Sequence, residues 1–112
     1  MNTLAIAASA LIAQQTNVAV IAGNVANATT PDYKARTAQL VPMDSSNGYG
    51  GVKVGAIITD VAPPPFSGGA SNQEVDLVAE FANLMQARTA YSAALKVVAS
   101  SDQMTHALLA SV

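Results

Sequence analysis

The chain has 112 residues, of which 51% are hydrophobic and only 11% are charged, and its net charge at pH 7 is −2. Its five lysines and arginines are scattered, which argues against a nucleic-acid-binding surface or an electrostatic contact with an anionic bilayer. The absence of cysteine excludes disulfides and thiolate metal sites. This length suits one domain, and the abundance of alanine favours long helices that gain burial from partner chains over a compact monomer.

Residues 1–30 predict a long apolar helix, because no charged side chain precedes Asp32. A 4-3 spacing of mostly apolar residues, typical of a coiled-coil seam, runs along this segment. Its members are Leu4, Ala8, Leu11, Gln15, Val18, Ala22 and Val25. Pro31 disfavours helical geometry at the preceding residue, so we expect the helix to end by about Ala28.

The uncharged N-terminal segment allows two other interpretations. A transmembrane helix needs about 20 predominantly apolar residues, and the polar run from Gln14 to Asn17 interrupts the candidate span. A cleaved secretory signal begins with a positively charged region, which is absent, although residues 8–10 and 26–28 resemble cleavage sites. We favour a helix that protein buries on several sides, and we expect no membrane span.

Residues 31–72 predict a loop, a short β-region and a linker. The segment 33–61 alternates in polarity and is rich in β-branched residues, which favours two strands. Asn47 and Gly48 form a turn signal in the connection between the strands. Three prolines and two glycines within residues 62–72 are typical of a linker.

Residues 73–112 predict one long helix, because neither glycine nor proline occurs there. Ser71 and Glu74 have the spacing of a capping box, and Asp76 and Glu80 suit a helix N-terminus. A second 4-3 series comprises Leu77, Phe81, Leu84, Arg88, Tyr91, Leu95, Val98, Asp102, Thr105, Leu109 and Val112. The sequence therefore predicts a mainly α fold in one structural domain, whose N- and C-terminal helices pair as a coiled coil beside a hairpin-like middle.

No group of residues predicts catalysis. The only histidine, His106, lies one helical turn after Asp102, without a nucleophile in a plausible context. Asp76 and Glu80 share a helix face, but no nearby histidine completes a metal site. We therefore expect a protein that is not an enzyme and that takes no cofactor, metal, nucleic acid or small-molecule substrate.

Two motifs carry a resemblance to a known family. The stretch from residue 24 to 36 resembles the signature that follows the first helix in bacterial flagellar basal-body rod and hook proteins. The signature residues here are Asn24, Ala26, Asn27, Thr30, Pro31, Tyr33 and Lys34. Asp32 stands where that family usually has glycine. Residues 75–104 are similar to the family's closing helix, and the short middle resembles the short proximal rod proteins.

This resemblance implies a structural subunit of the proximal rod that polymerises helically into a hollow drive shaft for motility. Its partners would be further copies of itself and other rod proteins, with the basal-body rings and the export gate as neighbours. The resemblance also implies export by the flagellar type III pathway without a cleaved signal, and a place within the periplasmic envelope. The expected interface residues are Leu4, Leu11, Val18, Val25, Leu77, Phe81, Leu84, Tyr91, Leu95, Val98 and Leu109. The alternative is a small secreted or export-apparatus helical adaptor that forms a discrete oligomer.

Overall fold

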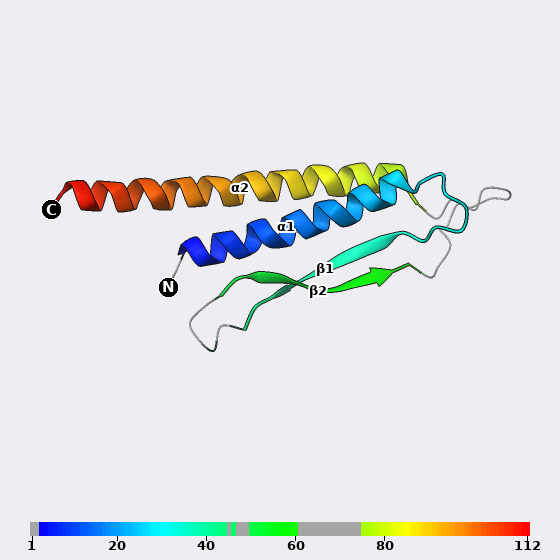
Figure 1. Cartoon of the computed structure of the whole chain (residues 1–112), viewed down its shortest axis with the longest axis horizontal. Helices are drawn as coiled ribbons and strands as arrows, with labels where there is room; N and C mark the ends of the chain where they lie inside the picture. The colour runs from blue at the N-terminus through cyan, green and yellow to red at the C-terminus, as the bar shows by residue number, and fades with distance from the viewer. Residues whose placement is uncertain (1–2, 45, 47–49, 61–74) are drawn as a thin grey trace.

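The computed structural model describes residues 3–44, 46, 50–60 and 75–112. Its elements follow in the order α1 (Thr3–Ala26), β1 (Arg36–Pro42), β2 (Val52–Thr59) and α2 (Leu77–Ala110). The molecule is elongated, with extents of 69 × 27 × 18 Å. Figure 1 shows α1 between α2 on one side and the two strands on the other. The predicted fold class, mainly α with paired terminal helices and a hairpin-like middle, is confirmed.

The two helices run antiparallel and side by side (Figure 1). On α2 the most buried residues recur every seven positions, at Glu80, Ala87 and Ala94. Half-buried residues complete a 4-3 series between and beyond them, namely Leu84, Tyr91, Val98 and Ser101. Small residues at the tightest positions let the helix backbones approach closely. The buried residues of α1 are Ala7, Ala13, Ile21 and Asn24.

The seam of α2 differs from the sequence-predicted one at alternate positions. Leu84, Tyr91 and Val98 belong to both series, but the structure has Ala87 and Ala94 where the prediction placed Arg88 and Leu95. The spacing of large apolar residues does not identify the contact positions here. Alanine fits between two closely packed helices, so the larger side chains lie at the sides of the contact. Leu95 is accordingly 45% exposed within the chain.

The helix ends also differ slightly from the prediction. Helix α2 begins at Leu77, four residues after the expected start, because the Asp76 carboxylate accepts hydrogen bonds from the backbone N–H groups of Val78 (3.0 Å) and Ala79 (3.3 Å). The predicted capping box at 71–74, the linker at 62–72 and the turn signal at Asn47 and Gly48 lie outside the described residues. Helix α1 ends at Ala26.

The two strands form an antiparallel ribbon, as predicted for the middle of the chain. Pairing runs from Arg36 opposite Thr59 to Pro42 opposite Val52, and it shifts after Gln39. Gly55 falls between the paired residues at this shift, which is the arrangement of a β-bulge. A two-stranded ribbon is only marginally stable by itself, so its contact with α1 is what holds it in place.

Ser9 connects α1 to the ribbon. Its hydroxyl donates to the Ile6 carbonyl (2.7 Å) and accepts a hydrogen bond from the Val52 backbone N–H (3.1 Å). Gly51 lies against Ser9 with φ +154°, and a Cβ atom there would be only 2.6 Å from Ser9 Oγ. The close approach of helix and ribbon at this point therefore requires glycine.

Replacing Gly51 with alanine should lower the free energy of unfolding by about 1–3 kcal/mol, because the new methyl group clashes with Ser9 and the backbone conformation is strained. Urea denaturation followed by circular dichroism measures this change. Gly50→Ala is the matched control, since its Cβ atom would be 3.9 Å from the nearest atom, Ile6 Cδ1. Equal stability of the two variants would contradict the argument.

Helix α2 continues past the start of α1 (Figure 1). Every residue from Asp102 to Val112, here called the C-terminal extension, is exposed. The extension nevertheless carries large apolar side chains at Met104, Leu108 and Leu109. Exposed apolar side chains gathered in one segment are a candidate surface for contact with another molecule.

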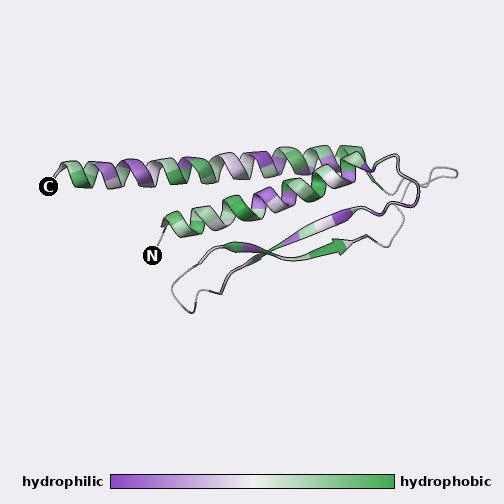
Figure 2. Ribbon diagram, viewed as in Figure 1, coloured by the Kyte–Doolittle hydropathy of each residue, from purple (hydrophilic) through white to green (hydrophobic). Residues whose placement is uncertain are grey.

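Helix α1 is also long and apolar enough to cross a membrane, by length and composition alone. Figure 2 shows it mostly in hydrophobic colours, with a hydrophilic break near its middle. A buried core helix of a soluble protein and a signal sequence near an N-terminus pass the same test, and α1 packs against other elements on two sides. This property alone therefore assigns no membrane span.

Candidate assembly site around Asn24

Asn24, near the end of α1, is fully buried and makes four hydrogen bonds. Its Nδ2 group donates to the Arg36 carbonyl (2.7 Å) and to Glu80 Oε1 (3.0 Å). Its Oδ1 atom accepts from the Tyr33 hydroxyl (3.1 Å) and from the Arg36 N–H (2.9 Å). An amide side chain offers two donors and two acceptors, and all four are used here.

These bonds join three parts of the chain at one point. Asn24 belongs to α1, Arg36 begins β1, and Glu80 lies in the first turn of α2. We call this group of residues, Asn24, Tyr33, Arg36 and Glu80, the hub. Because a buried polar group without a partner is costly, the hub fixes how the ribbon and α2 sit on α1.

Asn27 and Thr30 end helix α1. The Asn27 side chain donates to the Gly23 carbonyl (2.9 Å), and the Thr30 hydroxyl donates to Asn27 Oδ1 (3.1 Å). The Thr30 N–H donates to the Asn27 carbonyl (2.9 Å), which turns the chain toward the hub. Of the other signature residues, Ala26, Pro31 and Lys34 are exposed.

Glu80 is the hub residue that sequence reasoning missed, since it was interpreted as an acidic residue matching the helix dipole. It is only 8% exposed, and its Oε2 atom has no hydrogen-bond partner among the described residues. Burial raises the pKa of the Glu80 carboxyl above its usual value; the hydrogen bond from Asn24 opposes this shift, and the charges of Asp60 and Asp76 add to it. The Val-Asp-Leu-x-x-Glu motif at residues 75–80 was the sequence feature that could have identified Glu80.

A small pocket of about 160 Å³ lies beside the hub, between α1, β1 and α2. Its lining is mostly polar and comprises Asn17, Val20, Ile21, Arg36, Thr37, Ala38, Glu80, Asn83 and Gln86. Ligand sites for small molecules are usually about 300–1,000 Å³ and predominantly apolar. This space, the Glu80 pocket, is smaller and more polar than that.

The predicted interface residues divide into three groups. Leu4, Leu95 and Val98 line one groove of about 960 Å³, formed by the start of α1 and the second half of α2. A second groove, of about 410 Å³, is lined by Val18, Leu84 and Tyr91. Leu11 and Val25 are half-buried elsewhere along α1, whereas Leu77, Phe81 and Leu109 are exposed.

The described residues show no constellation that would support catalysis or metal binding. They contain no cluster of three or more side chains able to hold a metal ion. His106 lies 3.4 Å from the Asp102 carboxylate, and both side chains are about 70% exposed, at 74% and 69%.

Comparison with known proteins identifies the family. Residues 4–34 match the family described as "Flagella basal body rod protein", and residues 70–111 match "Flagellar basal body rod FlgEFG protein C-terminal". The flagellar basal-body rod protein FlgC of Salmonella typhimurium is 34% identical over 122 aligned positions, which cover 93% of this chain and 91% of the relative. FlgC of Salmonella typhi matches to the same extent. The chain belongs to the flagellar basal-body rod proteins.

The hub joins the two segments that match the rod protein families. Asn24 and Tyr33 lie in the first matched segment, and Glu80 lies in the second. Within one chain, their hydrogen bonds connect residues 56 positions apart in sequence. Two of the signature residues, Asn24 and Tyr33, therefore belong to the hub, and Asn24 makes the hydrogen bond to α2.

Asp32 stands at the position where the sequence resemblance implied a glycine. Its φ is +60°, in the left-handed region that glycine adopts without penalty. Aspartate is among the few other residues that visit this conformation, because its short polar side chain can hydrogen-bond locally. The turn of this rod protein thus keeps a glycine-like backbone with an aspartate side chain.

Replacing Glu80 with glutamine should stabilise the chain near neutral pH and change its pH dependence. The pKa of the Glu80 carboxyl is raised by folding, so its contribution to stability is present below the unfolded pKa and is lost as pH rises through the folded pKa. Glutamine keeps an acceptor for Asn24 without the buried charge. Urea midpoints measured from pH 7 down to pH 4 should show the advantage of the variant shrinking as pH falls; a constant or growing advantage would contradict this assignment.

Proposed function

We propose that this protein is a structural subunit of the proximal part of the flagellar basal-body rod. The observation that carries the proposal is the 34% identity to FlgC over nearly the whole of both chains. The protein would act by polymerising helically through its terminal helices, as one structural domain, rather than by catalysing a reaction. Its partners would be further copies of itself and other flagellar rod proteins.

The exposed apolar surface of the chain supports this proposal. Leu108 in the C-terminal extension is 69% exposed, and the groove beside Leu4 and Leu95 is lined mainly by apolar side chains. Burying apolar surface stabilises an assembly by about 25 cal/mol for each Å². A polymer of such subunits gains this burial, whereas a free monomer leaves the surface in water.

The same proposal includes the cellular location of the protein and its export pathway. The subunit would leave the cytoplasm through the flagellar type III pathway without a cleaved signal, and would lie within the periplasmic envelope, with the basal-body rings and the export gate as neighbours. Sequencing the N-terminus of the protein isolated from basal bodies tests the route. A first residue just after Ala10 or Ala28 would instead show cleavage of a secretory signal.

Purification of intact basal bodies tests the function. The protein should co-purify with them, and deletion of its gene should leave cells without complete rods and non-motile, with recovery on expression of the wild-type chain. Native mass spectrometry of the chain with rod partners adds a second readout. A stable discrete oligomer that is absent from basal bodies would favour the adaptor interpretation and reject the rod subunit.

A further inference from the structure

Among the described residues, the buried carboxylate of Glu80 lacks a partner for one of its two oxygens. Oε1 is bound by Asn24, whereas Oε2 has no donor among the described residues. Asp60 and Asp76 add negative potential around it. Arg36 lines the same pocket from β1, and α1 contributes only uncharged side chains there. A carboxylate in this setting gains most from a cation.

The Glu80 pocket has room for one long side chain. Its volume is about 160 Å³, and the amide side chains of Asn17, Asn83 and Gln86 line it together with Glu80. These amides offer acceptors for an ammonium group, which has three donors. The pocket therefore combines a negative charge, additional acceptors and the size of a single lysine.

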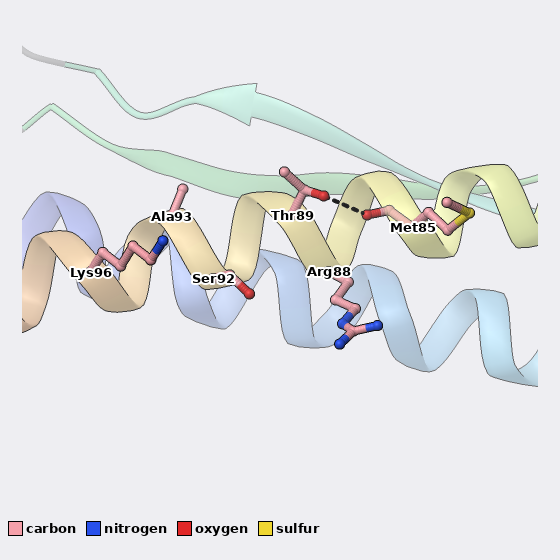
Figure 3. Close-up of a pocket in the computed structure, with 6 residues that line it drawn as sticks. All are labelled: Met85, Arg88, Thr89, Ser92, Ala93 and Lys96. Atoms are coloured by element: carbon pink, nitrogen blue, oxygen red, sulfur yellow. Dashed lines mark hydrogen bonds between the residues drawn. The ribbon is translucent and has the colours of Figure 1, made fainter.

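Lys96 is an exposed cation on α2, and its surroundings leave room for a second molecule to approach. Figure 3 shows it beside Ala93 and Ser92 on a shallow hollow of the α2 surface. No carboxylate among the described residues pairs with it. Its neighbours one turn away are all small, namely Ser92, Ala93, Ala99 and Ser100. A second molecule can thus approach the α2 backbone closely at this point, with the lysine projecting toward it.

Arg88 is the other cation on this part of α2, and it fits less well. It lines the same hollow as Lys96 and also the groove formed by Val18, Leu84 and Tyr91. Its guanidinium is larger than an ammonium group. The smaller head group of lysine therefore favours Lys96 for a pocket of about 160 Å³.

We propose that Lys96 of one copy of this chain inserts into the Glu80 pocket of a second copy. The inference rests on the proposed function and names a contact between subunits. Lys96 and Glu80 lie at different places on the molecule, so each copy can give its lysine to one neighbour and receive a lysine from another. A head-to-tail contact of this kind leaves both ends open and extends a chain of subunits. For parallel neighbours the offset along α2 is about 24 Å, because 16 residues separate the two positions and each rises 1.5 Å.

Four variants expressed in motile cells test the contact. Lys96→Gln and Glu80→Gln should each lower the number of complete rods by about tenfold, since each leaves the other charged group unpaired. The double variant should be no worse than either single variant, because both remove the same contact. Lys96→Arg keeps the charge and should retain most of the rods. Lys53→Gln is the matched control for the loss of one exposed lysine, and it should assemble like the wild type.

The monomer provides the readout that separates assembly from folding. Urea denaturation should show Lys96→Gln as stable as the wild type and Glu80→Gln more stable, so fewer rods in both variants cannot arise from misfolding. Normal rods with Lys96→Gln, or additive losses in the double variant, would overturn the contact. The proposed function would survive that result if the wild-type chain still co-purifies with basal bodies.

Electron cryomicroscopy of the assembled rod gives the direct observation. The Lys96 Nζ atom of a neighbouring copy should lie within hydrogen-bond distance of Glu80 Oε2. Solvent alone in the Glu80 pocket, or a basic side chain of a different rod protein, would reject the pairing of two copies.

Discussion

Replacing Asn24 with alanine should lower the free energy of unfolding by about 3–5 kcal/mol, the largest effect expected from a single substitution in this chain. The change leaves four groups without their Asn24 partner, namely the Tyr33 hydroxyl, the N–H and carbonyl of Arg36, and the buried Glu80 carboxylate. Urea denaturation followed by circular dichroism measures the loss. Since small domains are stable by only about 5–15 kcal/mol, this loss is a large fraction of the total, and the urea midpoint should fall sharply.

Two further variants make the Asn24 result specific. Asn24→Asp keeps the acceptor but loses both donated hydrogen bonds and places a second carboxylate beside Glu80, so it should also be strongly destabilising. Asn17→Ala is the control on the same helix, because among the described residues its side chain hydrogen-bonds only to Gln14 (3.3 Å). A loss for Asn24→Ala as small as that for Asn17→Ala would disprove the role of the hub.

Leu95→Asp should abolish rod assembly and leave cells non-motile while barely changing the stability of the monomer. Leu95 is 45% exposed in the single chain and lines the groove beside Leu4, so a charge there remains in contact with water until a second subunit covers it. Once covered, an unpaired charge costs several kcal/mol at each interface. Motility on soft agar and electron microscopy of basal bodies measure assembly, and the protein found outside the cytoplasm measures export.

Two further variants distinguish an effect on folding from an effect on assembly. Leu11→Asp should also prevent rod formation, with some loss of monomer stability because Leu11 is half-buried. Gln39→Asp adds the same charge at an exposed position of β1 and should assemble like the wild type. Normal rods and normal swimming with Leu95→Asp would show that assembly leaves this groove uncovered.

Sequence patterns predicted the elements well and their contacts less well. Length, periodicity and Pro31 were enough to predict two long helices and the β-region between them. The register failed at Leu95 and Ala94, because both fit a 4-3 pattern and only the close approach of two backbones selects the smaller residue. In a helix as rich in alanine as α2, hydrophobic periodicity therefore locates the buried face only to within one residue.

The hub lay beyond what sequence spacing could predict. Asn24 was recognised from its motif, but its four partners come from positions 33, 36 and 80, and geometry alone shows that one amide satisfies them all. The same holds for Asp32, whose place in the turn was identified by resemblance and whose positive φ is a property of the folded backbone. Long-range polar contacts leave no periodic pattern in a sequence.

The pairing of the first helix with the last sets the order in which this chain can fold. The hydrogen bond between Asn24 and Glu80 spans 56 residues, and the seam of α2 reaches Ser101. Contacts so distant in sequence form late, since the intervening loop must close before they provide any stabilisation. Before α2 is present, α1 can pack only against the ribbon, and α2 has no surface to pack on until α1 is present. The protein therefore stays without its native helix pairing until residues from both matched segments are present together.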